Sequence, residues 1–158
     1  MEAMTESVWD YPRPPRIEPC TKRIRVVLGG EVIVDTTAAV RVLEKSLAPS
    51  YYVPPGEVKA GALEPSGGRT TVCEWKGEAS YFDVVAGGRR ASRGAWSYPE
   101  PHEAFEAIRG WVAFYPGRMD SCFVDDEPVQ AQEGGFYGGW ITSDIVGPFK
   151  GAPGTAGW

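Results

Sequence analysis

The chain has 158 residues, of which 42% are hydrophobic and 23% charged, and these values are typical of one globular domain. A formal net charge of −5 without a basic stripe argues against nucleic-acid binding, and no segment approaches the ~20 apolar residues needed to cross a bilayer. Twenty glycines, 14 prolines and many aromatic residues favour short strands joined by turns, so we predict a mainly β fold.

Residues 1–22 are predicted to form an extended arm ahead of a single β domain over residues 23–131. Met1–Ser7 has the composition of a loose tail. The run Tyr11-Pro12-Arg13-Pro14-Pro15 favours polyproline-type backbone, because proline fixes φ and cannot donate a hydrogen bond. We expect this arm to pack along its own domain.

The β domain is predicted to begin with a hairpin followed by a short helix. Two runs rich in β-branched residues, 24–28 and 31–35, are separated by Gly29-Gly30, which is typical of a two-residue hairpin turn. A capping Asp-Thr-Thr sequence then precedes apolar residues at helical spacing, so residues 38–45 are predicted to be helical.

The middle of the chain is predicted to be built of further strands. Residues 51–53 form a short apolar run that ends at a proline pair, and residues 58–63 are a second candidate strand. Residues 69–75 and 78–85 are predicted to pair as a hairpin around the Lys76-Gly77 corner.

The last third of the domain is predicted to close the sheets. Residues 90–98 form an extended segment, a helix follows over residues 102–109, and residues 111–115 and 121–124 are the closing strands. The segment 132–158 is rich in glycine yet still aromatic, which disordered tails are not. We therefore predict an irregular arm that lies on the domain or on a partner subunit.

The metal-binding and redox residue types are too sparse to predict a cofactor. Cys20, Cys73 and Cys122 form no C-x-x-C pair, and His102 is the single histidine. Asp125-Asp126-Glu127 is interpreted as an acidic surface turn. Because no signal-peptide pattern is present, we expect a cytoplasmic protein without a metal or cofactor.

The Lys76 hairpin is the first candidate for a functional site. Gly77 lets the backbone turn sharply and approach a ligand, with Cys73 and Lys76 on either side of the turn. A lysine in an aromatic site can act as a base or nucleophile, or it can bind an anion. The alternative is a structural hairpin with an exposed lysine and an inert cysteine.

Arg41 and Glu44 form a second candidate pair, three residues apart on the predicted helix. They could form a weak surface ion pair, or point inward as an anion clamp and a carboxylate. Aromatic side chains on the predicted strands could wall a pocket or simply fill the core. These aromatic residues are Tyr51, Tyr52, Tyr81, Trp96 and Tyr98.

Several motifs occur together in the order and spacing of one known family. They are Asp35-Thr36, Glu44, Pro49, Tyr51-Tyr52-Val53-Pro54, Cys73-Glu74-Trp75-Lys76-Gly77-Glu78-Ala79-Ser80-Tyr81, Trp96-Ser97-Tyr98-Pro99 and Ala113-Phe114-Tyr115. Over residues 23–129 the chain resembles the bacterial domain of unknown function 427, which carries a nucleotidyltransferase-like label. The resemblance implies a compact β-tent-like arrangement of two antiparallel sheets with one or two short helices.

Together these observations predict a small-molecule enzyme of unassigned reaction, with its pocket between the sheets. Lys76 and Glu44 are the predicted acid–base residues, and Arg41 is the predicted anion anchor. The predicted ligand-contacting walls are Tyr52, Cys73, Tyr81 and Trp96. The alternatives are a non-catalytic ligand-binding module and a structural homo-oligomer joined by its terminal arms. Nucleotidyl transfer is less well supported, because closely spaced magnesium-binding carboxylates are missing.

Overall fold

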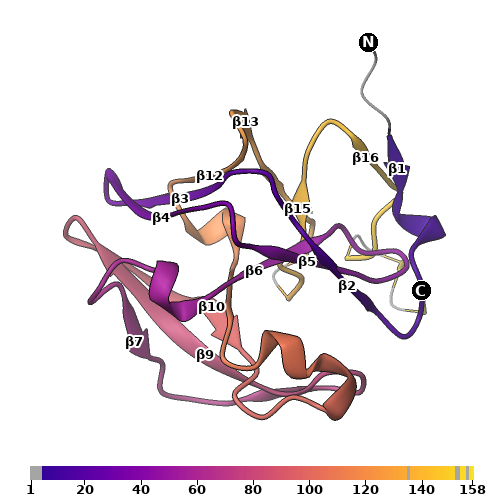
Figure 1. The fold of residues 1–158 in the computed structure, drawn as a ribbon, viewed down its shortest axis with the longest axis horizontal. Helices are drawn as coiled ribbons and strands as arrows, with labels where there is room; N and C mark the ends of the chain where they lie inside the picture. The colour runs from indigo at the N-terminus through magenta and orange to yellow at the C-terminus, as the bar shows by residue number, and fades with distance from the viewer. Residues whose placement is uncertain (1–4, 135, 152–153, 156) are drawn as a thin grey trace.

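The computed structural model describes residues 5–134, 136–151, 154–155 and 157–158. Within these residues the protein is mainly β, with two principal antiparallel sheets, as the sequence predicts (Figure 1). The helical segments in this part of the chain are all short 3-10 turns. They are η1 (Val8–Asp10), η2 (Pro55–Glu57), η3 (Glu103–Ile108) and η4 (Pro116–Arg118). No helix of the described chain is long and apolar enough to span a bilayer.

The strands form one large sheet, one small sheet and two short pairs. The eight-stranded sheet has the order β2 (Arg16–Pro19), β5 (Val40–Leu43), β6 (Ser50–Val53), β11 (Val112–Phe114), β10 (Arg89–Ser97), β9 (Gly77–Ala86) and β7 (Leu63–Pro65), with β8 (Thr71–Cys73) on β9. The four-stranded sheet has the order β13 (Glu127–Pro128), β12 (Ser121–Val124), β3 (Ile24–Leu28) and β4 (Glu31–Thr36). The short pairs are β1 (Glu6–Ser7) with β16 (Ile145–Val146), and β14 (Gln130–Ala131) with β15 (Trp140–Ile141).

The β3–β4 hairpin has the predicted two-residue glycine turn. Gly29 and Gly30 have φ of 61° and 76°, a backbone region that glycine adopts without steric cost. A Cβ on Gly29 would lie 2.1 Å from the Ala86 carbonyl oxygen, and one on Gly87 would lie 1.9 Å from the Gly29 oxygen. The turn of the small sheet therefore packs backbone to backbone against the β9–β10 turn.

The predicted helix over residues 38–45 is wrong, because Val40–Leu43 is strand β5 in the large sheet. The cap-like hydrogen bond does form, from the Ala38 amide to Thr36 Oγ1 at 3.0 Å, but no helix follows it. β5 pairs with β2 on one edge and with β6 on the other. Backbone hydrogen bonds to these two neighbouring strands outweigh the weak helix propensity of the segment itself.

The second predicted helix, residues 102–109, is also not an α-helix. Glu103–Ile108 forms the 3-10 segment η3, with Phe105 in a non-helical conformation at its centre. The inward face is nonetheless the predicted one, since Phe105 and Ile108 are both buried. Packing of two apolar side chains against the large sheet fixes this segment without a regular helix.

Both predicted arms contact the domain in the same chain. Arg16–Pro19 is an edge strand of the large sheet, and Glu6–Ser7 pairs with β16. Trp140 is 1% exposed and donates from its indole Nε1 to the Phe114 carbonyl oxygen at 3.0 Å. Residues 1–4 of the predicted tail, and residues 135, 152–153 and 156 of the C-terminal arm, lie outside the described residues.

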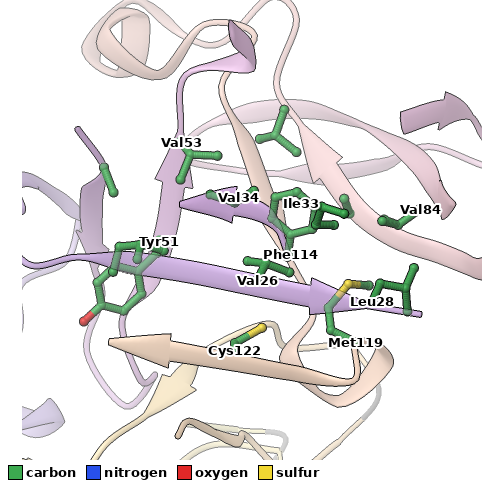
Figure 2. Packing of buried hydrophobic residues seen from close by; sticks show 14 of the residues in the cluster. Val26, Leu28, Ile33, Val34, Tyr51, Val53, Val84, Phe114, Met119 and Cys122 are labelled. Carbon is green, nitrogen blue, oxygen red and sulfur yellow. The ribbon is translucent and has the colours of Figure 1, made fainter. Parts of the chain in front are cut away.

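The main hydrophobic core fills the space between the two sheets (Figure 2). The small sheet contributes residues such as Val26 and Ile33, and the large sheet contributes Tyr51, Val84 and Phe114. Neighbouring residues on the large sheet point the opposite way, because side chains alternate between the two faces of a strand. A second cluster on that outer face contains Tyr52, Trp96 and Ala113, and it is covered by Phe105 and Ile108 of η3.

Candidate functional site

A cavity of about 300 Å³ opens on the outer face of the large sheet. Its walls come from four parts of the chain. Glu44 comes from the β5–β6 connection, and Lys76 comes from the β8–β9 hairpin. Trp96 and most of the tyrosines come from strands β6, β9 and β10 and from the residues that follow β10 and β11. The C-terminal arm contributes Phe136 and Lys150. We call this cavity the outer-face pocket.

The predicted location of the pocket between the sheets is wrong. That space holds the apolar core, whose large-sheet members Val53, Val84 and Phe114 are at most 1% exposed. Tyr52 lies beside Val53 in β6, and Trp96 follows the core residue Ala95 in β10, so both point to the other face. The alternation of the strands thus separates the packed face from the pocket face.

Most of the predicted site residues lie together in this pocket. Lys76, Glu44, Tyr52, Cys73, Tyr81 and Trp96 all line it. They come from the β5–β6 connection, from strands β6, β9 and β10, and from the hairpin that begins with β8. Arg41 is the exception, and it lies at a different part of the sheet.

Lys76 and Glu44 form an ion pair at the pocket wall. Lys76 Nζ lies 3.8 Å from Glu44 Oε1, and the two side chains are 10% and 20% exposed. The Lys76 ammonium also lies 5.8 Å from the centre of the Tyr98 ring, which is a cation–π distance. A separation of 3.8 Å is too long for a hydrogen bond, so the two charges attract each other without a direct bond.

The position of Lys76 is fixed by its backbone rather than by its side-chain partners. It ends the turn between β8 and β9, and Gly77 after it has a φ of 113°. The His102 amide donates to the Lys76 carbonyl oxygen at 2.8 Å, and His102 Nδ1 lies 3.0 Å from the Trp75 carbonyl oxygen. His102 therefore holds the hairpin in place.

Tyrosine and tryptophan side chains form a connected wall of the pocket. Trp96 Nε1 donates to Tyr52 Oη at 3.1 Å, and the Trp96 ring centre lies 4.6 Å from that of Tyr115. Burial raises the pKa of Tyr52, Tyr98 and Tyr115 above the usual tyrosine value. These hydroxyls therefore stay protonated at neutral pH and can donate hydrogen bonds.

Arg41 holds the N-terminal strand instead of lining the outer-face pocket. Its guanidinium donates to both carboxylate oxygens of Glu6 at 3.1 Å and also binds Glu18. Burial disfavours the charged guanidinium, but the hydrogen bonds to Glu6 and Glu18 outweigh it and raise the pKa of Arg41. Arg41 pairs with Tyr51 across β5 and β6, so it lies on the same side of the sheet as that core residue.

The sequence interpretation missed the contribution of the C-terminal arm to the pocket. Phe136, Tyr137 and Lys150 line it, and Tyr115 Oη donates to the Phe136 carbonyl oxygen at 3.1 Å. A Cβ on Gly138 would lie 2.1 Å from Trp96 Cη2, so the arm runs directly over the indole ring. The glycine–aromatic composition of the arm was the available signal, since it indicates close backbone approach to rings.

No cluster of three or more histidine, cysteine, aspartate or glutamate side chains suited to a metal ion occurs in the described ranges. In the pocket lining, the carboxylates are those of Glu44 and Glu74, and two lysines accompany them. This donor set does not fit the paired magnesium-binding carboxylates that nucleotidyl transfer requires.

Comparison with known proteins identifies a family. No curated protein matches the chain. The profile of the family described as "Domain of unknown function (DUF427)" matches residues 16–125, which include the Lys76 hairpin, Glu44 and strands β2 to β12. The matched range covers most of the sequence, and the protein belongs to this family of unknown function.

Proposed function

We propose that the outer-face pocket binds a small organic molecule and converts it by acid–base chemistry at Lys76 and Glu44. The observation that carries this proposal is the meeting of the two charged side chains at 3.8 Å on an aromatic wall. Partly buried charges next to a cavity are typical of functional sites, because packing alone would favour apolar residues there.

The spacing of the pair leaves room for a substrate atom. At 3.8 Å the ammonium and the carboxylate do not bond each other directly, so one substrate group can reach both. In this mechanism Glu44 accepts a proton from the substrate, and Lys76 stabilises the negative charge that develops beside it. The two side chains are only 10% and 20% exposed, and partial burial strengthens both interactions.

The alternative is a binding module without catalysis. It is favoured by the hydrogen bonds that wall residues already make inside the protein, such as Trp96 to Tyr52 and Tyr115 to Phe136. A homo-oligomer remains a prediction too, although Trp140 of the arm is buried within its own chain. We further propose a cytoplasmic location, because Cys20, Cys73 and Cys122 are all free thiols.

The proposal is tested first by identifying a retained molecule. Protein purified from its native host is analysed by native mass spectrometry, and any bound compound is incubated with fresh apoprotein and followed by chromatography. We expect wild type to convert the compound, and Glu44→Gln and Lys76→Met to bind it with at least about 100-fold slower turnover.

Glu64→Gln serves as the matched control, because Glu64 pairs with Arg90 on the surface away from the pocket. It should convert the compound at the wild-type rate. Circular dichroism and thermal unfolding check that each variant is folded. Recovery of the compound unchanged from wild type would favour the binding module, and wild-type turnover by both pocket variants would contradict the assigned roles.

A further inference from the structure

We propose that the ligand of the outer-face pocket is a small aromatic acid, a compound of one or two rings with a carboxylate or similar anionic group. This inference deepens the proposed function, since it needs the pocket to be a ligand site, but it does not need catalysis. It rests on three features of the pocket, namely its cations, its aromatic walls and its size.

Two ammonium groups line the cavity from different parts of the chain. Lys76 Nζ lies 5.8 Å from the Tyr98 ring centre, and Lys150 Nζ lies 5.7 Å from the Tyr137 ring centre. Lys76 has Glu44 as a partner, whereas Lys150 makes no salt bridge within the part of the chain that the structure describes. Lys150 is therefore a cation whose charge is available to an anionic ligand.

Two guanidinium groups lie over the rings of other tyrosines that line the pocket. The Arg93 guanidinium lies 3.9 Å from the Tyr81 ring centre, and that of Arg118 lies 4.0 Å from the Tyr115 ring centre. Neither arginine lines the cavity itself, although the tyrosine that each one covers does. Their positive charges add to the potential in the cavity.

The charge balance at the pocket differs from that of the whole chain. The protein has a net charge of −5. The lining contains two lysines, Lys76 and Lys150, and two carboxylates, Glu44 and Glu74, of which Glu74 is exposed to solvent, and Arg93 and Arg118 lie behind two of its tyrosines. The two lysines of the lining and the two arginines behind its tyrosines favour an anionic ligand and disfavour a cationic one.

The aromatic walls and the size of the cavity indicate a ring. Trp96 and Tyr115 both line the cavity, with ring centres 4.6 Å apart, and Val72 and Phe136 add exposed apolar surface to the lining at 74% and 59% exposure. Aromatic side chains favour offset or edge contacts with a flat ligand. A volume of about 300 Å³ is at the small end of ligand pockets, which suits one or two rings.

The test uses three probes of the same shape and different charge: 2-naphthoate, 2-naphthamide and 2-naphthylmethylamine. Calorimetry on the full-length protein measures the affinity of each. We expect 2-naphthoate to bind about tenfold more tightly than the amide, and the amine to bind most weakly, because a charge-assisted contact is worth about one order of magnitude. The preference for the acid should decrease with added salt.

Lys150→Gln should bring the affinities of the acid and the amide to within about twofold of each other, whereas Lys59→Gln, in a surface pair with Glu31, should leave their ratio unchanged. If the amide or the amine binds as tightly as the acid, the anionic class is wrong while the pocket remains a ligand site. If none of the three binds, the aromatic-acid assignment is wrong, and the retained-molecule experiment then tests the proposed function independently.

Discussion

The two faces of the large sheet are built from the same strands, but one face packs in the core and the other borders a cavity. On the inner face, Val53 and Phe114 pack against the small sheet and are at most 1% exposed. On the outer face, Tyr52, Trp96 and Ala113 belong to a second cluster, and Tyr52 and Trp96 of this cluster border a cavity. The inner face is closed by another sheet, whereas a hairpin, a 3-10 segment and the C-terminal arm lie over the outer face. The cavity lies on the side whose cover is irregular.

The charged residues of the two faces differ in the same way. Arg41, on the side of the core residue Tyr51, donates two hydrogen bonds to Glu6 and two to Glu18. Lys76, on the pocket side, has Glu44 at 3.8 Å without a hydrogen bond. A buried charge that is held by several hydrogen bonds fixes the segments it joins, whereas a charge with donors left over can bind a ligand. The completeness of pairing therefore separates structural charges from candidate functional ones.

The largest expected effect on stability comes from creating a cavity in the core on the inner face. Phe114→Ala removes a ring that is 1% exposed, so we expect the free energy of unfolding to fall by about 3–5 kcal/mol. On the outer face, Tyr81→Phe removes only the hydroxyl that lies 2.8 Å from Thr71 Oγ1, and it should cost about 1 kcal/mol. Urea unfolding followed by circular dichroism measures both.

Val72→Ala is the control for that comparison, because Val72 is 74% exposed and its truncation should change stability by less than about 0.5 kcal/mol. Similar losses for Phe114→Ala and Tyr81→Phe would contradict the division of the sheet into a packing face and a site face.

A smaller loss of stability is expected from a substitution in the C-terminal arm, where it lies over the pocket. Gly138→Ala places a methyl group 2.1 Å from Trp96 Cη2, so the arm must shift, and we expect a loss of about 1–3 kcal/mol. Gly56→Ala is the matched control, because a Cβ there would meet nothing within 4 Å. Hydrogen exchange should rise at residues 136–141 in the first variant alone. Equal behaviour of the two variants would mean that the arm does not rest on Trp96.

Local sequence signals were sufficient where the structure depends on a turn. Gly29-Gly30 predicted the β3–β4 hairpin, and the motif around Lys76 predicted a second one, because positive φ angles and turn residues are local properties. The same signals grouped Lys76, Cys73 and Tyr81, since they lie on one hairpin. Glu44 was selected through its spacing from Arg41 on a predicted helix that does not form, and it also belongs to the motifs of the family resemblance.

Sequence reasoning failed where a distant partner decides the structure. Val40–Leu43 has helical spacing of its apolar residues, yet β2 and β6 supply hydrogen bonds on both edges and make it a strand. Tyr51 and Tyr52 were grouped as candidate wall residues, but neighbours in a strand face opposite ways, and the docking of the small sheet determines that Tyr51 faces the core. Lys150 lies on irregular backbone, where no periodicity indicates a direction.

The smallest expected effect on stability comes from Glu6, which accepts hydrogen bonds from Arg41. Burial raises the pKa of Glu6, but hydrogen bonds from Arg41 and Tyr11 more than offset this, so its pKa in the folded protein is below the usual value. Its folded pKa is thus lower than its unfolded one. The stability that this carboxylate adds is present above the unfolded pKa and is lost as the pH falls through the folded pKa.

We therefore expect wild type to be more stable than Glu6→Gln by a constant margin above about pH 5, and the margin to shrink below it. Because the Glu6 side chain is 38% exposed, the margin should be at most about 1 kcal/mol, and it should decrease in high salt. Urea unfolding of both proteins between about pH 3 and pH 7 measures it. Parallel profiles over this range would show that the ionisation of Glu6 is not coupled to folding, and would remove the contrast with the loosely paired Lys76.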